Sequence, residues 1–140
     1  MSTVVATSSQ FATHIAGPWP SGRGPSDRLR VTLTAPTDSV TLCALVGEVD
    51  YYSADVFRSR LLESLETAGS VVVVDLSRVT FFGSAGLRVL IEAESLVGPP
   101  GGKLVLITGR RCVDRLLAAA GDVAVFRTVT SLAEVMADAA

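Results

Sequence analysis

The pattern of apolar and polar positions divides the chain, from about residue 28 onward, into short strand-like and helix-like segments. Apolar and polar residues alternate over residues 29–33, which is typical of a half-buried strand, and a second, mostly apolar run over 40–46 also predicts a strand. A turn signal with Pro36 lies between them, so the two segments are predicted to form a hairpin. Gly47 is expected to end the second strand and to open a loop over residues 48–52.

Four later segments repeat apolar residues every three or four positions, which predicts amphipathic helices. They are expected over residues 53–68, 84–97, 112–121 and 131–138. Ser53 is a candidate N-cap for the first of these helices. Ser131 and Glu134 have the spacing of a capping box at the start of the last one.

Three apolar runs between these helices predict strands over residues 71–76, 103–107 and 123–126. The first contains four consecutive valines, and the first two are apolar enough to lie near the middle of a sheet, buried on both faces. A short connection is expected between residue 76 and Ser84. Because strands alternate with helices, the sequence predicts an α/β fold, a single mixed β-sheet of about five strands with about four α-helices.

Residues 1–27 differ in composition from the rest of the chain. They are rich in Ser, Gly and Pro and are predicted to form a flexible tail, because such a segment buries too little to offset its ordering entropy. Trp19, which lies between two prolines, is either a docking residue or an unanchored residue of this tail. Residues 28–140 are long enough for one domain with its own core.

Charge and hydropathy narrow the range of partners. The formal net charge is −2, which gives no general attraction to nucleic acid or to anionic membranes. The sequence has no apolar run of transmembrane length and no pattern of a secretory signal. A cytoplasmic location is therefore expected.

The sequence offers few residues for catalysis or metal binding. Its one histidine, His14, precedes the domain, and its two cysteines, Cys43 and Cys112, match no metal-ligand spacing. No metal site and no cofactor are expected. The cysteines are either small buried residues of a protein in a reducing compartment or a redox pair that gates partner binding.

Ser84 has the position that most invites a functional interpretation. It follows a buried strand and opens a helix, where a serine can serve as an N-cap, a nucleophile or a modification site. Residues 83–86 read Gly-Ser-Ala-Gly rather than G-x-S-x-G, and the domain has no histidine that would serve as a base. An enzyme is therefore not expected.

The residues around Ser84 resemble the STAS domain of bacterial anti-sigma factor antagonists, and the likeness covers residues 29–138. It rests on Asp75-Leu76-Ser77, Phe81-Phe82, Gly83-Ser84-Ala85-Gly86-Leu87 and Gly47-Glu48-Val49-Asp50, and on the order of elements in residues 103–138. Many members of that family carry Asp directly before the serine, where this chain has Gly83.

The resemblance implies a regulatory protein that binds an anti-sigma factor with serine kinase activity and so frees a sigma factor. Phosphorylation of Ser84 would end the binding, and a serine phosphatase would restore it. A phosphate at a helix N-terminus is compatible with the fold and adds about −1.5 to −2 charges to the contact surface. The alternative function is a STAS accessory subunit of a lipid-transport or stress-sensing complex that is not phosphorylated.

Partner contacts are expected from the loop after the second strand and from the solvent side of the helix that Ser84 opens. The apolar flank of that helix either contacts the partner or packs on a neighbouring helix. The two tyrosines either contact the partner or form a half-buried aromatic pair. The expected contact residues are Asp50, Tyr51, Tyr52, Gly83, Ala85, Gly86, Arg88, Val89, Glu92 and Leu96.

Overall fold

The computed structural model describes residues 28–67, 71–97, 104–121 and 125–139. The predicted tail, residues 1–27, lies outside the described residues, as do His14 and Trp19. Within the described residues, five strands form one mixed sheet in the order β1-β2-β3-β4-β5. The first pair is antiparallel and each later pair is parallel. The strands are β1 (Leu29–Thr37), β2 (Val40–Val49), β3 (Val71–Phe82), β4 (Leu104–Ile107) and β5 (Arg127–Val129).

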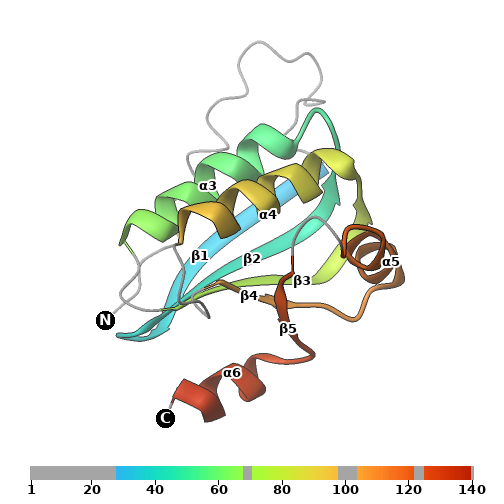
Figure 1. The fold of residues 1–140 in the computed structure, drawn as a ribbon. Coiled ribbons are helices and arrows are strands. Elements are labelled where there is room, and N and C mark those ends of the chain that lie inside the picture. The colour runs from blue at the N-terminus through green and yellow to red at the C-terminus, as the bar shows by residue number, and fades with distance from the viewer. Residues whose placement is uncertain (1–27, 68–70, 98–103, 122–124, 140) are drawn as a thin grey trace.

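Four helices pack on this sheet in the described part of the chain. Two of them, α3 and α4, lie side by side on one face, α5 lies at one end, and α6 lies on the opposite face (Figure 1). This arrangement confirms the predicted α/β fold with a single mixed sheet. The helices are α3 (Ala54–Thr67), α4 (Ser84–Leu96), α5 (Arg111–Ala119) and α6 (Leu132–Ala139).

The valine run of β3 forms the centre of the molecule because each sheet face has its own core. Val72 and Val74 face the larger core, which α3, α4 and α5 cover, whereas Val73 faces a smaller core that includes Val135 of α6. All three valines are at most 1% exposed. Burial of each such side chain stabilises the fold by about 1.5–3 kcal/mol, so β3 holds its position firmly.

Strands β2 and β3 are longer than the sequence predicts, since β2 continues through Gly47 to Val49 and β3 continues to Phe82. The pairing of the two strands shifts register twice, and each shift leaves one extra residue in β3. Such bulges break the alternation of apolar and polar positions, so residues 77–82 do not read as a strand. The first bulge is supported locally because the Asp75 carboxylate accepts hydrogen bonds from the backbone and hydroxyl of Ser77 (2.9 and 2.6 Å).

The two remaining differences lie at the ends of the domain. Strand β1 continues through Pro36 to Thr37, which an edge strand tolerates because its outer side forms no ladder. Strand β5 begins at Arg127, later than the predicted 123–126, of which residues 123–124 lie outside the described residues. Only Val129 of β5 is buried, so the strand gives almost no apolar signal.

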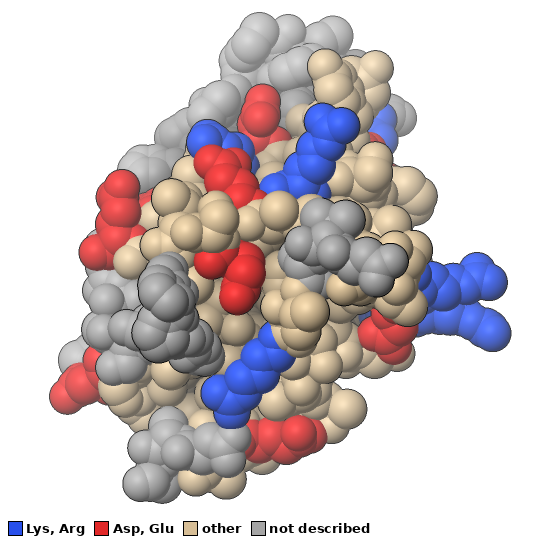
Figure 2. All heavy atoms as spheres, viewed as in Figure 1, with Lys and Arg blue, Asp and Glu red and all other residues tan. Residues whose placement is uncertain are grey.

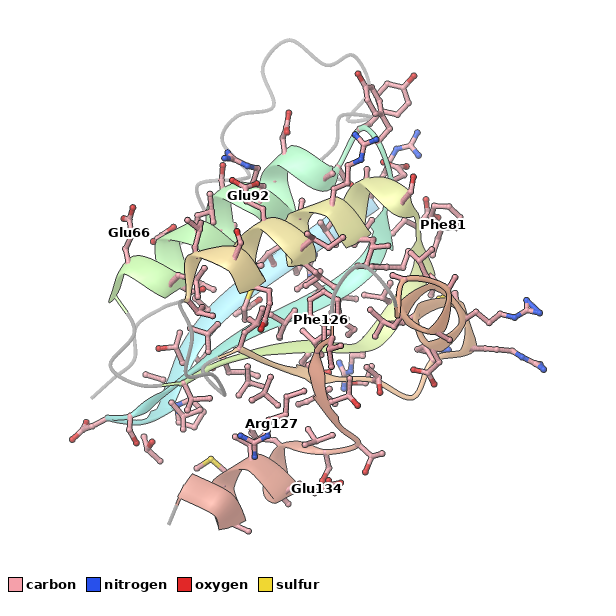
Figure 3. The ribbon with its side chains drawn as sticks, viewed as in Figure 1. Glu66, Phe81, Glu92, Phe126, Arg127 and Glu134 are labelled. Carbon is pink, nitrogen blue, oxygen red and sulfur yellow. The ribbon has the colours of Figure 1, made fainter. Side chains whose placement is uncertain are left out.

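Helix α6 begins as the sequence predicts, but its capping contacts differ from the expected capping box. The Glu134 carboxylate accepts hydrogen bonds from the backbone N–H and the hydroxyl of Thr130, not from the backbone of Ser131. The carbonyl of Ser131 accepts the backbone N–H of Glu134 at 3.2 Å. Glu134 thus closes the first turn of α6 one residue earlier than the pattern implies (Figure 3).

Candidate functional site

A hydrogen-bonded turn joins β2 to α3 and fixes one side of the candidate site. The Asp50 carboxylate accepts the backbone N–H groups of Tyr52 and Ser53, each at 2.9 Å, and a hydrogen bond from Arg28 Nη1 at 3.0 Å. The Ser53 hydroxyl donates to the carbonyl of Glu48 at 2.8 Å and accepts the N–H of Asp50 at 3.0 Å. Ser53 therefore precedes α3 as expected, but its hydroxyl stabilises the turn rather than capping the helix.

The ionised form of Asp50 is favoured by this turn. Burial raises the pKa of Asp50, but the hydrogen bonds from Ser53 and Tyr52 and the charge of Arg28 outweigh it, so the pKa lies below its usual value. Stability from this carboxylate is therefore present above the unfolded pKa and is lost as the pH falls through the folded pKa.

Replacing Asp50 by asparagine is expected to lower the free energy of unfolding by about 1–2 kcal/mol at neutral pH, because hydrogen bonds to a charged acceptor become neutral ones. The loss should shrink as the pH falls below about 4, where the unfolded carboxyl is protonated. Urea denaturation of both proteins between neutral and acidic pH measures the difference. A loss that does not change with pH would show that the charge of Asp50 is not what stabilises the turn.

The two tyrosines of this turn project into solvent. Tyr51 is 80% exposed and Tyr52 is 66% exposed, so the half-buried alternative is wrong. Their rings pack edge to face with centroids 5.3 Å apart, and the Arg28 guanidinium lies 5.9 Å from the Tyr52 centroid. Exposed aromatic rings held in a fixed arrangement are typical of protein contact surfaces.

Ser84 lies at the first position of α4, directly beside the end of β2. The Gly83 N–H donates to the carbonyl of Val49 at 2.9 Å, and the Gly83 carbonyl accepts the N–H of Gly86 at 3.0 Å. Gly83 is therefore the N-cap, with an extended backbone, and the alternative that Ser84 is the N-cap is wrong. Ser84 is exposed, and its hydroxyl forms no hydrogen bond with the described residues.

Phe81 is a surface residue that the sequence did not single out. It is 49% exposed and points outward beside the start of α4 (Figure 3). The sequence carried no signal for this exposure, because the bulges of β3 decide that Phe81 faces outward while its neighbour Phe82 is buried at 4% exposure. Since Phe81 pairs in register with Glu48, the ends of β2 and β3 lie together. We call the exposed pair of Tyr51 and Tyr52 the aromatic patch.

Two of the expected contact residues are buried instead. Gly86 faces the core, and a Cβ there would lie 2.7 Å from the Val49 side chain and 2.9 Å from the ring of Phe82. Val89 is 5% exposed and packs in the larger core. Both residues position α4 against the core, so neither is available for contact with a partner.

Replacing Gly86 by alanine is expected to lower the free energy of unfolding by up to about 2 kcal/mol, because overpacking costs about 1–3 kcal/mol and the helix-propensity gain of alanine is about 1 kcal/mol. The ring of Phe82 and the side chain of Val49 are nearly inaccessible and cannot swing away. Chemical denaturation checks the result. An alanine variant more stable than the parent would contradict the close approach of α4 to the sheet.

The rest of the expected contact surface runs along α4. Glu92 accepts two hydrogen bonds from Arg58 of α3, at 2.8 and 2.7 Å, and these hydrogen bonds lower the pKa of Glu92. Glu92 thus joins α4 to α3 through its ion pair with Arg58. Ala85 is partly exposed and Arg88 is exposed, both near Ser84. Leu96 is 61% exposed at the far end of the helix.

The two cysteines are free thiols in different surroundings. Cys43 is buried on β2, and burial raises the pKa of its thiol to about 12. Such a thiol is protonated and poorly reactive at neutral pH. Cys112 is partly exposed at the start of α5, with its Sγ 3.9 Å from the carbonyl of Val79. The interpretation of Cys43 as a small buried residue agrees with this burial.

Charged side chains of both signs are mixed on the face that Figure 2 shows. Acidic and basic groups alternate over α3 and α4, and basic side chains project where α5 lies, which carries the exposed Arg111 and Arg115. Among the described residues, no three His, Cys, Asp or Glu side chains are grouped closely enough to hold a metal ion. No helix in the described ranges combines the length and the apolar character needed to cross a membrane.

Comparison with known proteins identifies the family. The family model described as "STAS domain" matches residues 33–135, and the chain belongs to the STAS domain family. An anti-sigma-F factor antagonist of Mycobacterium tuberculosis, RsfB, is 31% identical over 72 residues, which are 51% of this chain and 58% of that relative. An anti-sigma F factor antagonist of Paenibacillus polymyxa is 28% identical over 83 residues, 59% of this chain and 71% of that relative.

A solved structure supports the same fold. The crystal structure of an anti-sigma factor antagonist from Mycobacterium paratuberculosis superposes with a TM-score of 0.71 and covers 80% of this chain and 94% of that chain. The identity is 21%, so the likeness is one of fold.

Proposed function

We propose that this protein is an anti-sigma factor antagonist, a regulator and not an enzyme, which binds an anti-sigma factor and so frees a sigma factor in the cytoplasm. The observation that carries the proposal is the position of Ser84, exposed and without a hydrogen-bond partner among the described residues. It lies at the start of α4, which is hydrogen-bonded through Gly83 to the end of β2, where the Asp50 turn begins. The names of the relatives within the STAS family support the same role.

In this proposal Ser84 is the phosphate acceptor of an anti-sigma factor that has serine kinase activity, and a serine phosphatase reverses the reaction. The backbone N–H groups of the first turn of α4 point toward that position and favour an anion. Phosphorylation would leave the fold intact but would add about −1.5 to −2 charges to the surface at the start of α4. A partner that covers this surface when Ser84 is unmodified would have to bury these charges once Ser84 is phosphorylated.

Gly83, where many family members have Asp, is compatible with this role. Its φ of −96° is open to any residue, so the glycine is not required by the backbone. A Cβ at this position would lie 3.1 Å from the Phe81 ring, which therefore packs closely over the start of α4. In this chain the ring of Phe81 thus lies beside the place of the family's carboxylate.

The test is to mix the protein with kinase-type anti-sigma factors from the same genome and ATP–Mg²⁺, and to map phosphate by mass spectrometry. We expect one phosphate on Ser84, none on the Ser84→Ala variant, and binding of the unmodified protein to the same factor. Phosphate elsewhere would contradict the assigned residue. Copurification with a transport subunit, without binding to any anti-sigma factor, would favour the accessory-subunit alternative.

A further inference from the structure

Arg88 is an exposed cation one helical turn after Ser84. Ser84 is the first residue of α4, and both side chains are exposed. Residues four positions apart on a helix share a face, with their Cβ atoms about 5–6 Å apart. Helical side chains also point back toward the N-terminus, so the geometry of α4 directs the long side chain of Arg88 over the turn that contains Ser84.

Two arginines of neighbouring elements already have acidic partners. Arg58 of α3 donates two hydrogen bonds to Glu92, at 2.8 and 2.7 Å. Arg28 donates a hydrogen bond to Asp50 at 3.0 Å. Within the described residues, no hydrogen bond or ion pair joins Arg88 to another side chain. Arg88 is therefore available for an anion on its own face of the helix.

We propose that Arg88 binds the phosphate of phosphorylated Ser84 and holds it against the first turn of α4. The inference rests on the proposed function, in which Ser84 is the phosphate acceptor. The guanidinium fork matches two phosphate oxygens, and such charge-assisted hydrogen bonds are stronger than neutral ones. An anion that precedes the cation is the favourable order for an i,i+4 pair, because the N-terminal end of the helix also attracts the anion. Arg88 is thus a positioning residue for the phosphate and shields it from a phosphatase.

The acidity of the phosphate tests this pair in the full chain made with phosphoserine at position 84. We expect its second pKa, followed by phosphorus NMR, to be at least about 0.3 lower in the parent than in the Arg88→Gln variant. Arg88→Lys should keep part of this difference, because lysine retains the charge but not the fork. Asp50 and Glu92 do not distort the comparison, because each has a pKa below its usual value and stays ionised near neutral pH. Equal values in the parent and in Arg88→Gln would overturn the proposal.

Arg30→Gln is the matched control for net charge. Arg30 is exposed on β1 between Leu29 and Val31, which face the larger core, so it points to the side of the sheet away from α4. This variant should leave the phosphate pKa unchanged. If Arg30→Gln and Arg88→Gln raise it equally, the effect is one of net charge and the pair does not form.

Removal of the phosphate gives a second measurement, with alkaline phosphatase as the probe. If Arg88 occupies the phosphate about half of the time or more, the phosphorylated Arg88→Gln variant should be hydrolysed at least about twofold faster than the parent. The Arg30→Gln variant should be hydrolysed at the rate of the parent. Equal rates for Arg88→Gln and the parent would contradict the shielding of the phosphate by Arg88.

Failure of this pair and failure of the proposed function are distinguishable. The phosphoserine is built into the chain, so neither measurement depends on a kinase. If no anti-sigma factor phosphorylates Ser84, the proposed function fails, whereas the pair with Arg88 is still measured. If the phosphate pKa shows no pair, the inference about Arg88 fails and the switch at Ser84 is unaffected.

Discussion

Replacing Ser84 by aspartate is expected to lower the affinity for the anti-sigma factor by about 30-fold or more, because an unpaired charge buried at an interface costs about 2–5 kcal/mol. The free protein should keep its stability, since a carboxylate in the first turn of α4 is favoured by the helix dipole. Ser84→Ala should bind within a few-fold of the parent, because it removes only a hydroxyl without a partner among the described residues. Isothermal titration calorimetry measures all three affinities.

A matched control separates this effect from a change in net charge. Ala133→Asp also adds one negative charge in the first turn of a helix, but on α6, which covers the opposite face of the sheet (Figure 1). This variant should bind like the parent. If Ala133→Asp and Ser84→Asp weaken binding equally, the effect is one of net charge and not of the position of Ser84.

Replacing Gly47 by alanine is expected to lower the free energy of unfolding by about 3–5 kcal/mol, the sum of backbone strain and overpacking. Gly47 has a φ of +120°, and a Cβ there would lie 2.1 Å from the carbonyl oxygen of Arg28. The obstacle is backbone, so no side chain can move aside. Relief of the clash requires β1 to separate from β2, and Arg28 to move away from Asp50.

The control for Gly47 is Gly109→Ala. Gly109 has a similar φ of +124°, but nothing lies within 4 Å of a Cβ placed there. The Gly109→Ala variant should lose only about 1–2 kcal/mol of its free energy of unfolding, which is the cost of the left-handed conformation alone. Guanidinium denaturation at constant m-value compares the two variants. Equal losses would show that the close approach of the Arg28 carbonyl to Gly47 does not contribute to the destabilisation by Gly47→Ala.

The sequence predicted the parts of the fold that local patterns encode. The valine run identified the central strand because burial on both faces leaves no polar position, and the spacing of apolar residues located α3 and α4. The end of β3 was not predicted, because two bulges change the phase of its alternation. The sequence alone does not show where these bulges fall, so it does not show which residues beyond them face the core.

The candidate site shows the same limit. Ser84 was found from its place between a strand and a helix, and the turn at Asp50 from its sequence. The burial of Gly86 and Val89 depends on how closely α4 approaches Val49 and Phe82, which is a contact between distant segments. Phe81 was missed because its exposure depends on which face of β3 the bulges leave outward.

The most direct test of the Ser84 switch compares two forms of the same protein, unmodified and carrying phosphoserine only at position 84. Both are titrated against the kinase-type anti-sigma factor in the absence of ATP. We predict that the unmodified form binds and that the phosphorylated form binds at least about 100-fold more weakly, with the same circular dichroism spectrum. Equal affinities of the two forms would contradict the switch at Ser84.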